Sequence, residues 1–296
     1  MDFPDSFGEH ILPDKIKALS VSFMVQNLNK NFGGTAGNIA YTLALLKQPT
    51  SILASAGAKD FDEYAAHIKN VGIDSDTIAI VNDEFTATAY IMTDKNNCQI
   101  TGFYPGAMTQ DTRLTLTNGQ FAVISPTVSA AMENFVSAAK KNQIPYLYDP
   151  AQQIPRLTTN QLANGVERAE IVIGNDYEIA LMMERTGFSK KDMLSKTKVL
   201  VTTLGEEGSL IETKNETISV GVAKPDMIVD PTGAGDAYIA GFIVGYTRQL
   251  PLQICGQLGA TTAAYAIEQY GTQNHRFTRE QFNDRYRESF GENSPL

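Results

Sequence analysis

Short apolar runs alternate with segments of helical periodicity through the middle of this 296-residue chain, and this alternation restricts the fold class more than any other feature. The runs lie at residues 121–125, 146–148, 171–173 and 199–201. Between the first two, residues 130–141 repeat apolar side chains at the spacing of one helical face, from Ala131 to Ala139. Runs that are apolar throughout are typical of strands covered on both faces. The chain is therefore predicted to be an α/β protein with a mostly parallel central sheet.

Polar side chains follow the predicted strands directly. They are Asp149, Asn175, Thr203 and, after a further apolar run at residues 227–229, Asp236. In parallel sheets covered by helices, ligands bind at the carboxyl ends of the strands. We therefore expect these side chains to share one rim of the sheet and to face one ligand.

A glycine-rich turn, Asp-Pro-Thr-Gly-Ala-Gly-Asp at residues 230–236, leads from the run 227–229 into a helix-like segment at 237–246. This layout places the N–H groups of Ala234 and Gly235 near a helix N-terminus. Unpaired amides and the helix dipole favour an anion there. The sequence therefore predicts an anion-binding turn.

Asp236 closes this turn, and its carboxylate would repel a bound phosphate. Its presence favours a role as a base that deprotonates an alcohol while the amides stabilise a phosphoryl group. Gly233 and Gly235 allow the positive φ angles that such a concave turn needs. Residue types alone leave an equal alternative, in which Asp236 is an ordinary helix N-cap.

The segment 230–236 resembles the C-terminal signature of the ribokinase-like (PfkB) carbohydrate kinases, and residues 33–38, Gly-Gly-Thr-Ala-Gly-Asn, resemble the glycine pair and Asn of their N-terminal motif. The two motifs occur in the family's order, roughly 200 residues apart, and are far more specific together than either is alone. The resemblance implies one ATP-dependent kinase domain over residues 1–296, a ribokinase-like three-layer α/β/α sandwich with a small β-sheet lid. The catalytic residues that it implies are Asp236, Gly233, Ala234 and Gly235.

The N-terminal motif supplies the acceptor side of such a kinase. The resemblance implies that Gly33 and Gly34 let the backbone approach a sugar and that the Asn38 amide hydrogen-bonds to its hydroxyl groups. We expect Asn38 to open a helix whose apolar face begins at Ile39. Without the family match, a plain N-cap would explain Asn38 equally well.

Two further segments match the family's nucleotide-binding elements, an Asn-x-x-Glu element and a Thr-x-Gly-x-x-Gly loop. The nucleotide-binding residues that they imply are Asn175, Thr203, Gly205 and Gly208. The resemblance also implies that Glu178 helps to hold Mg²⁺ indirectly and that Asp230 helps to hold a monovalent cation such as K⁺. From residue types alone, the first element reads as acids at a helix start and the second as a hairpin turn.

Residues 86–93 and 99–104 flank a turn-forming stretch at 94–97, which predicts a hairpin. Residues 20–25 are a candidate for a further strand beside it. With lid strands within 16–26 and 79–105, the patch resembles the β lid of the family, which closes over substrate and often joins a homodimer. The alternative is an edge hairpin without a function.

The acceptor is predicted from two further segments. Residues 149–155 lack the Asn and Arg that sugar kinases related to fructokinase carry there, whereas residues 93–108 and 6–13 resemble prokaryotic adenosine and nucleoside kinases. The resemblance therefore implies phosphorylation of the 5′-hydroxyl of a nucleoside, with adenosine preferred. The alternatives are ribokinase or another sugar kinase, and a non-catalytic nucleoside-binding protein.

Family members begin with a central strand, and Met1 aligns just beyond it. We therefore expect this chain to lack that strand and its turn, a segment of about 15–20 residues. Its two neighbours in the sheet would then have unpaired backbone groups.

Composition excludes several other classes. The formal net charge of −9 disfavours a nucleic-acid partner, because phosphate contacts need a basic face. Cys98 and Cys255 lie far apart, which suggests neither a disulfide framework nor a zinc site. An apolar run long enough to cross a membrane and a basic-then-apolar leader are both missing, so the sequence predicts no membrane partner and a cytoplasmic location.

Overall fold

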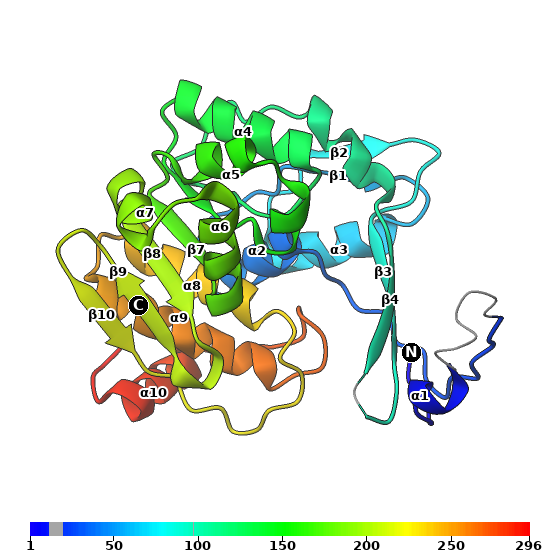
Figure 1. The fold of residues 1–296 in the computed structure, drawn as a ribbon. Coiled ribbons are helices and arrows are strands. Elements are labelled where there is room, and N and C mark those ends of the chain that lie inside the picture. Colours follow the sequence, from blue (N-terminus) through cyan, green and yellow to red (C-terminus); the bar gives the residue numbers. More distant parts are fainter. Residues whose placement is uncertain (12–19, 97) are drawn as a thin grey trace.

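A computed structural model describes residues 1–11, 20–96 and 98–296, and its centre is a six-stranded sheet of order β10-β9-β8-β7-β6-β5 (Figure 1). The strands are β5 Ala122–Ile124, β6 Tyr146–Tyr148, β7 Ile171–Asn175, β8 Val199–Thr203, β9 Ser209–Glu212 and β10 Thr217–Val220. Strands β5 to β8 run parallel, and β9 and β10 continue the sheet antiparallel. The apolar runs of the sequence therefore form the parallel strands, as predicted.

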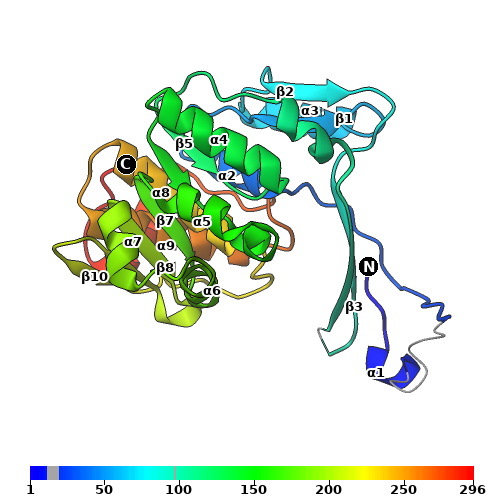
Figure 2. The same cartoon turned by 45° about the horizontal axis from the view of Figure 1, so that its top comes forward.

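Helices cover both faces of this sheet (Figures 1 and 2). One layer contains α2 Thr35–Leu45, α8 Ala234–Thr247, α9 Leu252–Ile267 and α10 Arg279–Phe290; the other contains α4 Ser129–Lys141, α5 Thr159–Val166, α6 Asp176–Thr186 and α7 Lys190–Lys196. Neighbouring residues of one strand point to opposite layers: Ile171 and Ile173 of β7 pack with α8, and Val172 packs with α4 and α6. The chain has the three-layer ribokinase-like fold.

Several helices of the second layer begin with a side-chain cap that the sequence specifies. Reciprocal capping boxes join Thr158 to Gln161, Asn175 to Glu178, Ser189 to Asp192 and, in the first layer, Thr278 to Gln281. Each box satisfies amides that a helix start leaves without partners, and an N-cap contributes about 1 kcal/mol. These caps fix where α5, α6, α7 and α10 begin, and α6 begins at the predicted rim.

A second, two-stranded parallel sheet lies apart from the central one. It pairs β1 Ala54–Gly57 with β2 Ile78–Val81 and packs against α2 and α3 Asp62–Val71. A cavity of about 1220 Å³ separates β1 and its preceding segment from β5. Backbone groups on both sides of this cavity have no hydrogen-bond partner within residues 1–11, 20–96 and 98–296. They belong to Ser51 and Leu53 on one side, and to Phe121 and Ser125 on the other. Two strand edges therefore face each other across an open gap.

The predicted hairpin is present as β3 Thr88–Thr93 and β4 Gln99–Tyr104, which form a small sheet that projects from the body (Figure 1). Asp94 organises its turn, since its carboxylate accepts hydrogen bonds from the amides of Asn96 at 2.8 Å and Cys98 at 2.9 Å. Its other oxygen accepts from the amide of Phe7, at the start of the short helix α1 Phe7–His10, at 2.8 Å.

The prediction of a further lid strand within residues 16–26 is wrong for the residues that the structure describes. Residues 16–19 of that prediction lie outside the described residues, and residues 20–25 form no strand. Asp2 instead bridges Thr93 and Asn27, so the first residues of the chain hold the place beside β3. The start of the range 79–105 also belongs elsewhere, because residues 79–81 lie in β2, which pairs with β1.

Within the described part of the chain, no helix combines the length and the apolar character that crossing a membrane requires.

Candidate active site

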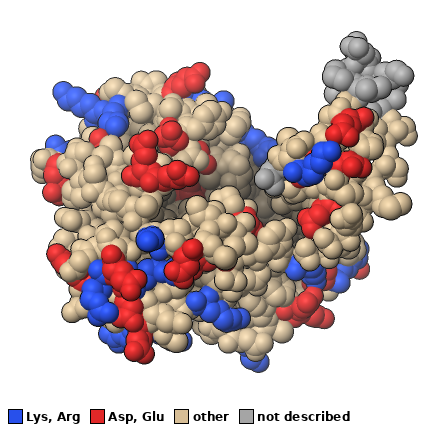
Figure 3. Space-filling model, turned by 90° about the horizontal axis from the view of Figure 1, so that it is seen from below, with Lys and Arg blue, Asp and Glu red and all other residues tan. Residues whose placement is uncertain are grey.

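Asp149, Asn175 and Thr203 end three neighbouring parallel strands, β6, β7 and β8, at the same edge of the sheet. Asn175 and Thr203 are direct partners in the β7–β8 register. The charge of Asp236, at the start of α8, contributes to the raised pKa of the buried Asp149 carboxyl group. The ends of β6, β7 and β8 therefore share one rim, as predicted. Seen from below, this side of the molecule is hollowed, with acidic side chains along the margin of the hollow (Figure 3).

The glycine turn forms the start of α8, with one change from the prediction. Gly233 is the N-cap residue with φ 83°, and a Cβ there would lie 2.9 Å from Thr272 Cγ2. The N–H of Ala234 is not free, because it donates to Pro231 O at 3.2 Å and closes the turn. In the described residues, the N–H groups of Gly235 and Asp236 have no backbone partner. The open amide pair is therefore shifted by one residue toward Asp236.

Asp236 is not the helix cap, since Gly233 holds that position and no side chain caps it. Its Oδ2 accepts a hydrogen bond of 2.7 Å from Asn38 Nδ2. Burial raises the pKa of Asp236 to about 6, while this hydrogen bond lowers it. Burial also raises the pKa of Asp149, and the charges of Asp236 and Glu178 add to that increase. A carboxyl group with a pKa near 6 is ionised at neutral pH and can still take up a proton effectively, as a general base must.

Asn38 lies elsewhere in its helix than predicted. The helix α2 begins at Thr35 after Gly34, which has φ 85°, so Asn38 is its fourth residue and does not open it. Asn38 is buried, and its side chain points to Asp236 rather than to the helix start. Its Oδ1 accepts a 3.0 Å hydrogen bond from Gln273 Nε2. The N-cap explanation of Asn38 is therefore wrong.

Thr272 and Gln273 are the polar neighbours that the sequence did not predict. Thr272 Oγ1 lies 2.8 Å from Asn38 Oδ1, and its single proton serves either that oxygen or Phe32 O, 3.0 Å away. Gln273 is buried in the same network. Both residues follow α9 and match no motif, and more than 230 residues separate them from Asn38. Only a pairing signal from related sequences would have indicated them.

The two elements that are predicted to bind the nucleotide have a structural role in the fold. The Asn175 and Glu178 side chains form the capping box of α6, with bonds of 2.8 Å in both directions. The stretch from Thr203 to Gly208 turns β8 into antiparallel β9, and Gly208 has φ 88° with Val220 O at 2.1 Å from a Cβ placed on it. The interpretation of residues 175–178 as a helix start and of residues 203–208 as a hairpin turn is therefore correct. Contact of either segment with a nucleotide stays a prediction.

Asp230 joins two loops beside the glycine turn. Its Oδ1 accepts from the amide of Thr232 at 2.9 Å, and its Oδ2 accepts from the amide of Gly271 at 3.1 Å. Among the described residues, no three His, Cys, Asp or Glu side chains gather as a metal cage. Any cation at this rim would therefore take part of its coordination from backbone oxygens, water or a bound phosphate.

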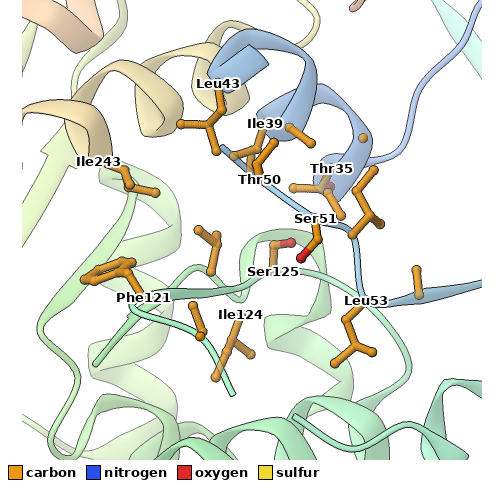
Figure 4. A pocket seen from close by; sticks show the side chains of 18 of the residues that line it. Thr35, Ile39, Leu43, Thr50, Ser51, Leu53, Phe121, Ile124, Ser125 and Ile243 are labelled. Atoms are coloured by element: carbon orange, nitrogen blue, oxygen red, sulfur yellow. The ribbon is translucent and has the colours of Figure 1, made fainter. Parts of the chain in front are cut away.

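The large cavity lies between β1 and β5, and it reaches Gly33 and Gly34 of the N-terminal motif (Figure 4). Its walls include Ile39 and Leu43 of α2, Ile124 of β5 and Ile243 of α8, whereas Asp236 and Asn38 are not among its lining residues. Its lining is thus largely apolar and contains neither of the two groups that carry the chemistry described above.

Comparison with known proteins identifies related kinases both by sequence and by structure. The family model of the pfkB family carbohydrate kinases matches residues 9–278. A nucleoside kinase of Methanocaldococcus jannaschii is 30% identical over 266 residues, which cover 88% of this chain and 87% of that protein. The structure of Burkholderia thailandensis nucleoside kinase in complex with inosine matches with a TM-score of 0.90 at 30% identity, covering 99% of this chain and 95% of that one. The ADP-inosine complex of that enzyme matches with a TM-score of 0.88 at 31% identity over 99% and 93% of the two chains.

Proposed function

This chain belongs to the pfkB family of carbohydrate kinases, and from that premise we propose that it transfers the γ-phosphoryl group of ATP to the 5′-hydroxyl of a nucleoside. The observation that carries the proposal is the buried Asp236 carboxylate next to the open amides at the start of α8. The nucleoside acceptor is supported by the relatives, which are nucleoside kinases over most of this chain.

In the proposed reaction Asp236 accepts the proton of the 5′-hydroxyl as that oxygen attacks the γ-phosphorus in line with the leaving ADP oxygen. The O–H bond breaks toward the Asp236 carboxylate, a new P–O bond forms, and the bond to ADP breaks. The N–H groups of Gly235 and Asp236, at the positive end of α8, stabilise the charge on the transferring group. Asn38 Nδ2 holds one carboxylate oxygen, which leaves the other for the proton.

The phosphate donor is proposed to lie along the rim formed by β7, β8 and their loops. Its contacts would be Asn175, Thr203, Gly205 and Gly208, with Gly233 and Ala234 shaping the turn below the γ-phosphate. Glu178 Oε2 is used by the capping box, so the remaining oxygen would reach Mg²⁺ through water, in keeping with the preference of Mg²⁺ for phosphate and water oxygens. When bound, Mg²⁺ would neutralise charge on the phosphates. Asp230, between the 230 and 271 loops, is the proposed monovalent-cation ligand.

Gly33, Gly34 and Asn38 are proposed to hold the ribose, and the lid is proposed to cover the base. Tyr90, Phe103 and Tyr104 of the lid are exposed and offer aromatic surface for stacking. The same exposed hairpin is the surface through which we propose that two copies pair. Adenosine is our preferred acceptor, and inosine is the first alternative because it is bound in the Burkholderia thailandensis structure.

A panel of acceptors tests this proposal. Purified protein is given Mg-ATP with adenosine, inosine, guanosine, cytidine, ribose or fructose, and ADP and the phosphorylated product are both measured. We expect a nucleoside 5′-monophosphate, with kcat/KM for a purine nucleoside well above that for either sugar. Transfer to ribose or fructose alone would indicate a sugar kinase. Binding of nucleosides without any transfer would indicate a non-catalytic binding protein.

A further inference from the structure

The Asn38 side chain that contacts Asp236 is itself held by a buried glutamine. Gln273 is 2% exposed, and its Nε2 lies 3.0 Å from Asn38 Oδ1 and 2.7 Å from the hydroxyl of Tyr64. Its Oε1 lies 3.1 Å from His67 Nε2. A chain of contacts therefore runs from His67 through Gln273 and Asn38 to Asp236.

The direction of these hydrogen bonds is fixed by the number of protons available. The Tyr64 hydroxyl donates its only proton to Gly33 O at 2.7 Å, so it must accept from Gln273 Nε2. The second N–H of Gln273 then meets Asn38 Oδ1, and the amide oxygen is left to accept from His67. The reverse orientation of Gln273 would place its oxygen against two acceptors.

The orientation of Gln273 decides what Asn38 presents to Asp236. With its Oδ1 engaged as an acceptor, Asn38 can present only its Nδ2 to Asp236 Oδ2, at 2.7 Å. That bond stabilises the ionised carboxylate and fixes its rotation. The second carboxylate oxygen is then directed away from Asn38 and is available to a substrate proton.

We propose that Gln273 is a positioning residue for the reaction, which holds Asn38 in the one orientation that keeps Asp236 ready to accept the proton. The proposal rests on the function proposed above and adds a residue that no motif contains. Because Gln273 acts through Asn38, its replacement should change kcat and the pH dependence of the reaction more than the KM of either substrate.

The titratable or charged groups near this network are Asp149, Glu178, His67 and Arg276, whose charge acts on His67. Asp149, after β6, is the carboxyl group whose charge interacts with that of Asp236, and Glu178 of α6 acts on Asp149. His67 of α3 lies behind Gln273, and burial lowers the pKa of its imidazole, so the ring is a neutral N–H donor at pH 7. No hydrogen bond in the described residues joins Gln273 to Asp149 or Glu178. His67 does contact Gln273, so Gln273→Glu also places a carboxylate beside its imidazole and raises the pKa of that ring.

Two variants separate positioning from a loss of packing. Gln273→Met keeps the length of the side chain but has no N–H. Asn38 Oδ1 then keeps only the Thr272 hydroxyl, whose single proton is shared with Phe32 O, so the amide is held less firmly. We expect kcat to fall by roughly 10–100-fold with both KM values nearly unchanged. Gln273→Glu places a carboxylate against Asn38 Oδ1 and favours the reversed Asn38 amide, whose oxygen then faces Asp236. In this variant the acidic limb of the kcat/KM profile should move up by about one pH unit, with activity recovering at higher pH.

Gln257→Met is the matched control. Gln257 is another buried glutamine, 8% exposed in α9, and it accepts a 2.6 Å hydrogen bond from the Tyr286 hydroxyl. It is not part of the hydrogen-bond network of Gln273, Asn38 and Asp236. Its replacement should lower thermal stability and leave the pH profile in place.

A second readout does not depend on turnover. The Asp236 carboxyl carbon is titrated by ¹³C NMR in the ligand-free protein, with Asp236→Asn used for assignment. We expect its midpoint to rise in Gln273→Glu and to stay constant in Gln257→Met. An unmoved midpoint and acid limb in both Gln273 variants would overturn the positioning role, whereas an inactive wild type with a shifted midpoint would overturn only the proposed kinase activity.

Discussion

Activity and stability favour opposite protonation states of Asp236. A general base must be ionised, yet this carboxyl group is buried enough to raise its pKa to about 6. Only the Asn38 amide offsets this effect among the causes of the shift. The folded protein therefore carries an unfavourable charge at neutral pH in the place where the proposed reaction needs one.

The first prediction concerns turnover. Asp236→Asn keeps the shape of the side chain and can still accept from Asn38, but it cannot take a proton. We expect kcat to fall by about 10²–10⁴-fold with the fold retained, since this is the usual contribution of a general base. Steady-state kinetics and circular dichroism measure the two quantities, and wild-type turnover in this variant would rule out Asp236 as the base.

The second prediction is the pH dependence of the wild-type enzyme. Because protonated Asp236 cannot accept the substrate proton, kcat/KM should fall as pH drops below about 6, following the raised pKa of that carboxyl group. The decline should approach tenfold per pH unit. A profile that stays flat down to pH 5 would contradict the assignment.

The third prediction concerns stability. The pKa of Asp236 is raised in the folded chain from 3.8 to about 6, so the folded state favours the protonated form. The resulting destabilisation is absent below pH 4, grows as pH rises to 6, and is complete above that value. Asp236→Asn should therefore be more stable than the wild type at pH 7.5 by on the order of 2–3 kcal/mol, and equally stable at pH 4. Chemical unfolding at the two pH values measures the difference, and an equal gain at both would point to another cause.

At the scale of elements, the start of α6 combines a helix cap with a predicted nucleotide contact. Asn175 and Glu178 satisfy each other's backbone amides, so a substitution at either residue lowers the stability of the fold whatever else the two residues do. The two roles differ in what they require of residue 175. A cap needs one acceptor oxygen, whereas a phosphate contact needs the amide N–H groups.

The fourth prediction uses that difference. Asn175→Ser keeps a good N-cap and removes the amide, whereas Asn175→Ala removes both. If Asn175 binds the nucleotide, the KM for ATP should rise in both variants, and the loss of stability, about 1 kcal/mol, should appear in Asn175→Ala alone. Kinetics at varied ATP and thermal unfolding distinguish the cases. An unchanged KM in Asn175→Ser would leave Asn175 as a cap only.

The sequence predicts some structural elements better than others, because some depend on local patterns and others on contacts between distant segments. The strands β5 to β8 and the helix α4 follow from local hydrophobic patterns, because each is buried on a side that its own sequence defines. Residues 20–25 have a similar local pattern, but Asp2 and its neighbours pair with β3 instead. Asp236 was found from a motif, whereas Gln273 was not, since its function depends on a contact between distant segments. Local sequence has no information about such contacts.

At the scale of the whole molecule, the gap between β1 and β5 separates two sheets that run in the same direction. Buried Asp111 lies between the two edges: Thr127 Oγ1, after β5, donates to Asp111 Oδ2 at 2.6 Å, and Ser55 of β1 is near the same carboxyl group. Asp111 Oδ1 and Ser55 Oγ have no hydrogen-bond partner in the described chain. One further parallel strand in this gap would pair with both edges and join the sheets.

The fifth prediction tests that fit. An extended segment of about five apolar residues, attached ahead of Met1 through a flexible linker, should enter the gap and raise the Tm, because it covers apolar walls and pairs with both edges. The same extension with proline at alternate positions is the control, since proline cannot donate to a strand ladder. Equal Tm values for the two extensions would mean that the gap does not accept a strand.

The separation of the two sheets also has a consequence for cooperativity. Since no ladder connects the described strands β1 and β5, the unit of β1, β2 and α3 is attached to the rest by the packing of α2 and of the segment Gly106–Arg113, and by the contacts of Tyr64 and His67 with Gln273. Such a unit can open while the six-stranded sheet stays intact, as a separate foldon. The amides of Ala54–Gly57 should then exchange with solvent deuterium through a lower-energy opening than those of Ile171–Asn175, and the exchange pattern would divide this single chain into two units of unequal stability.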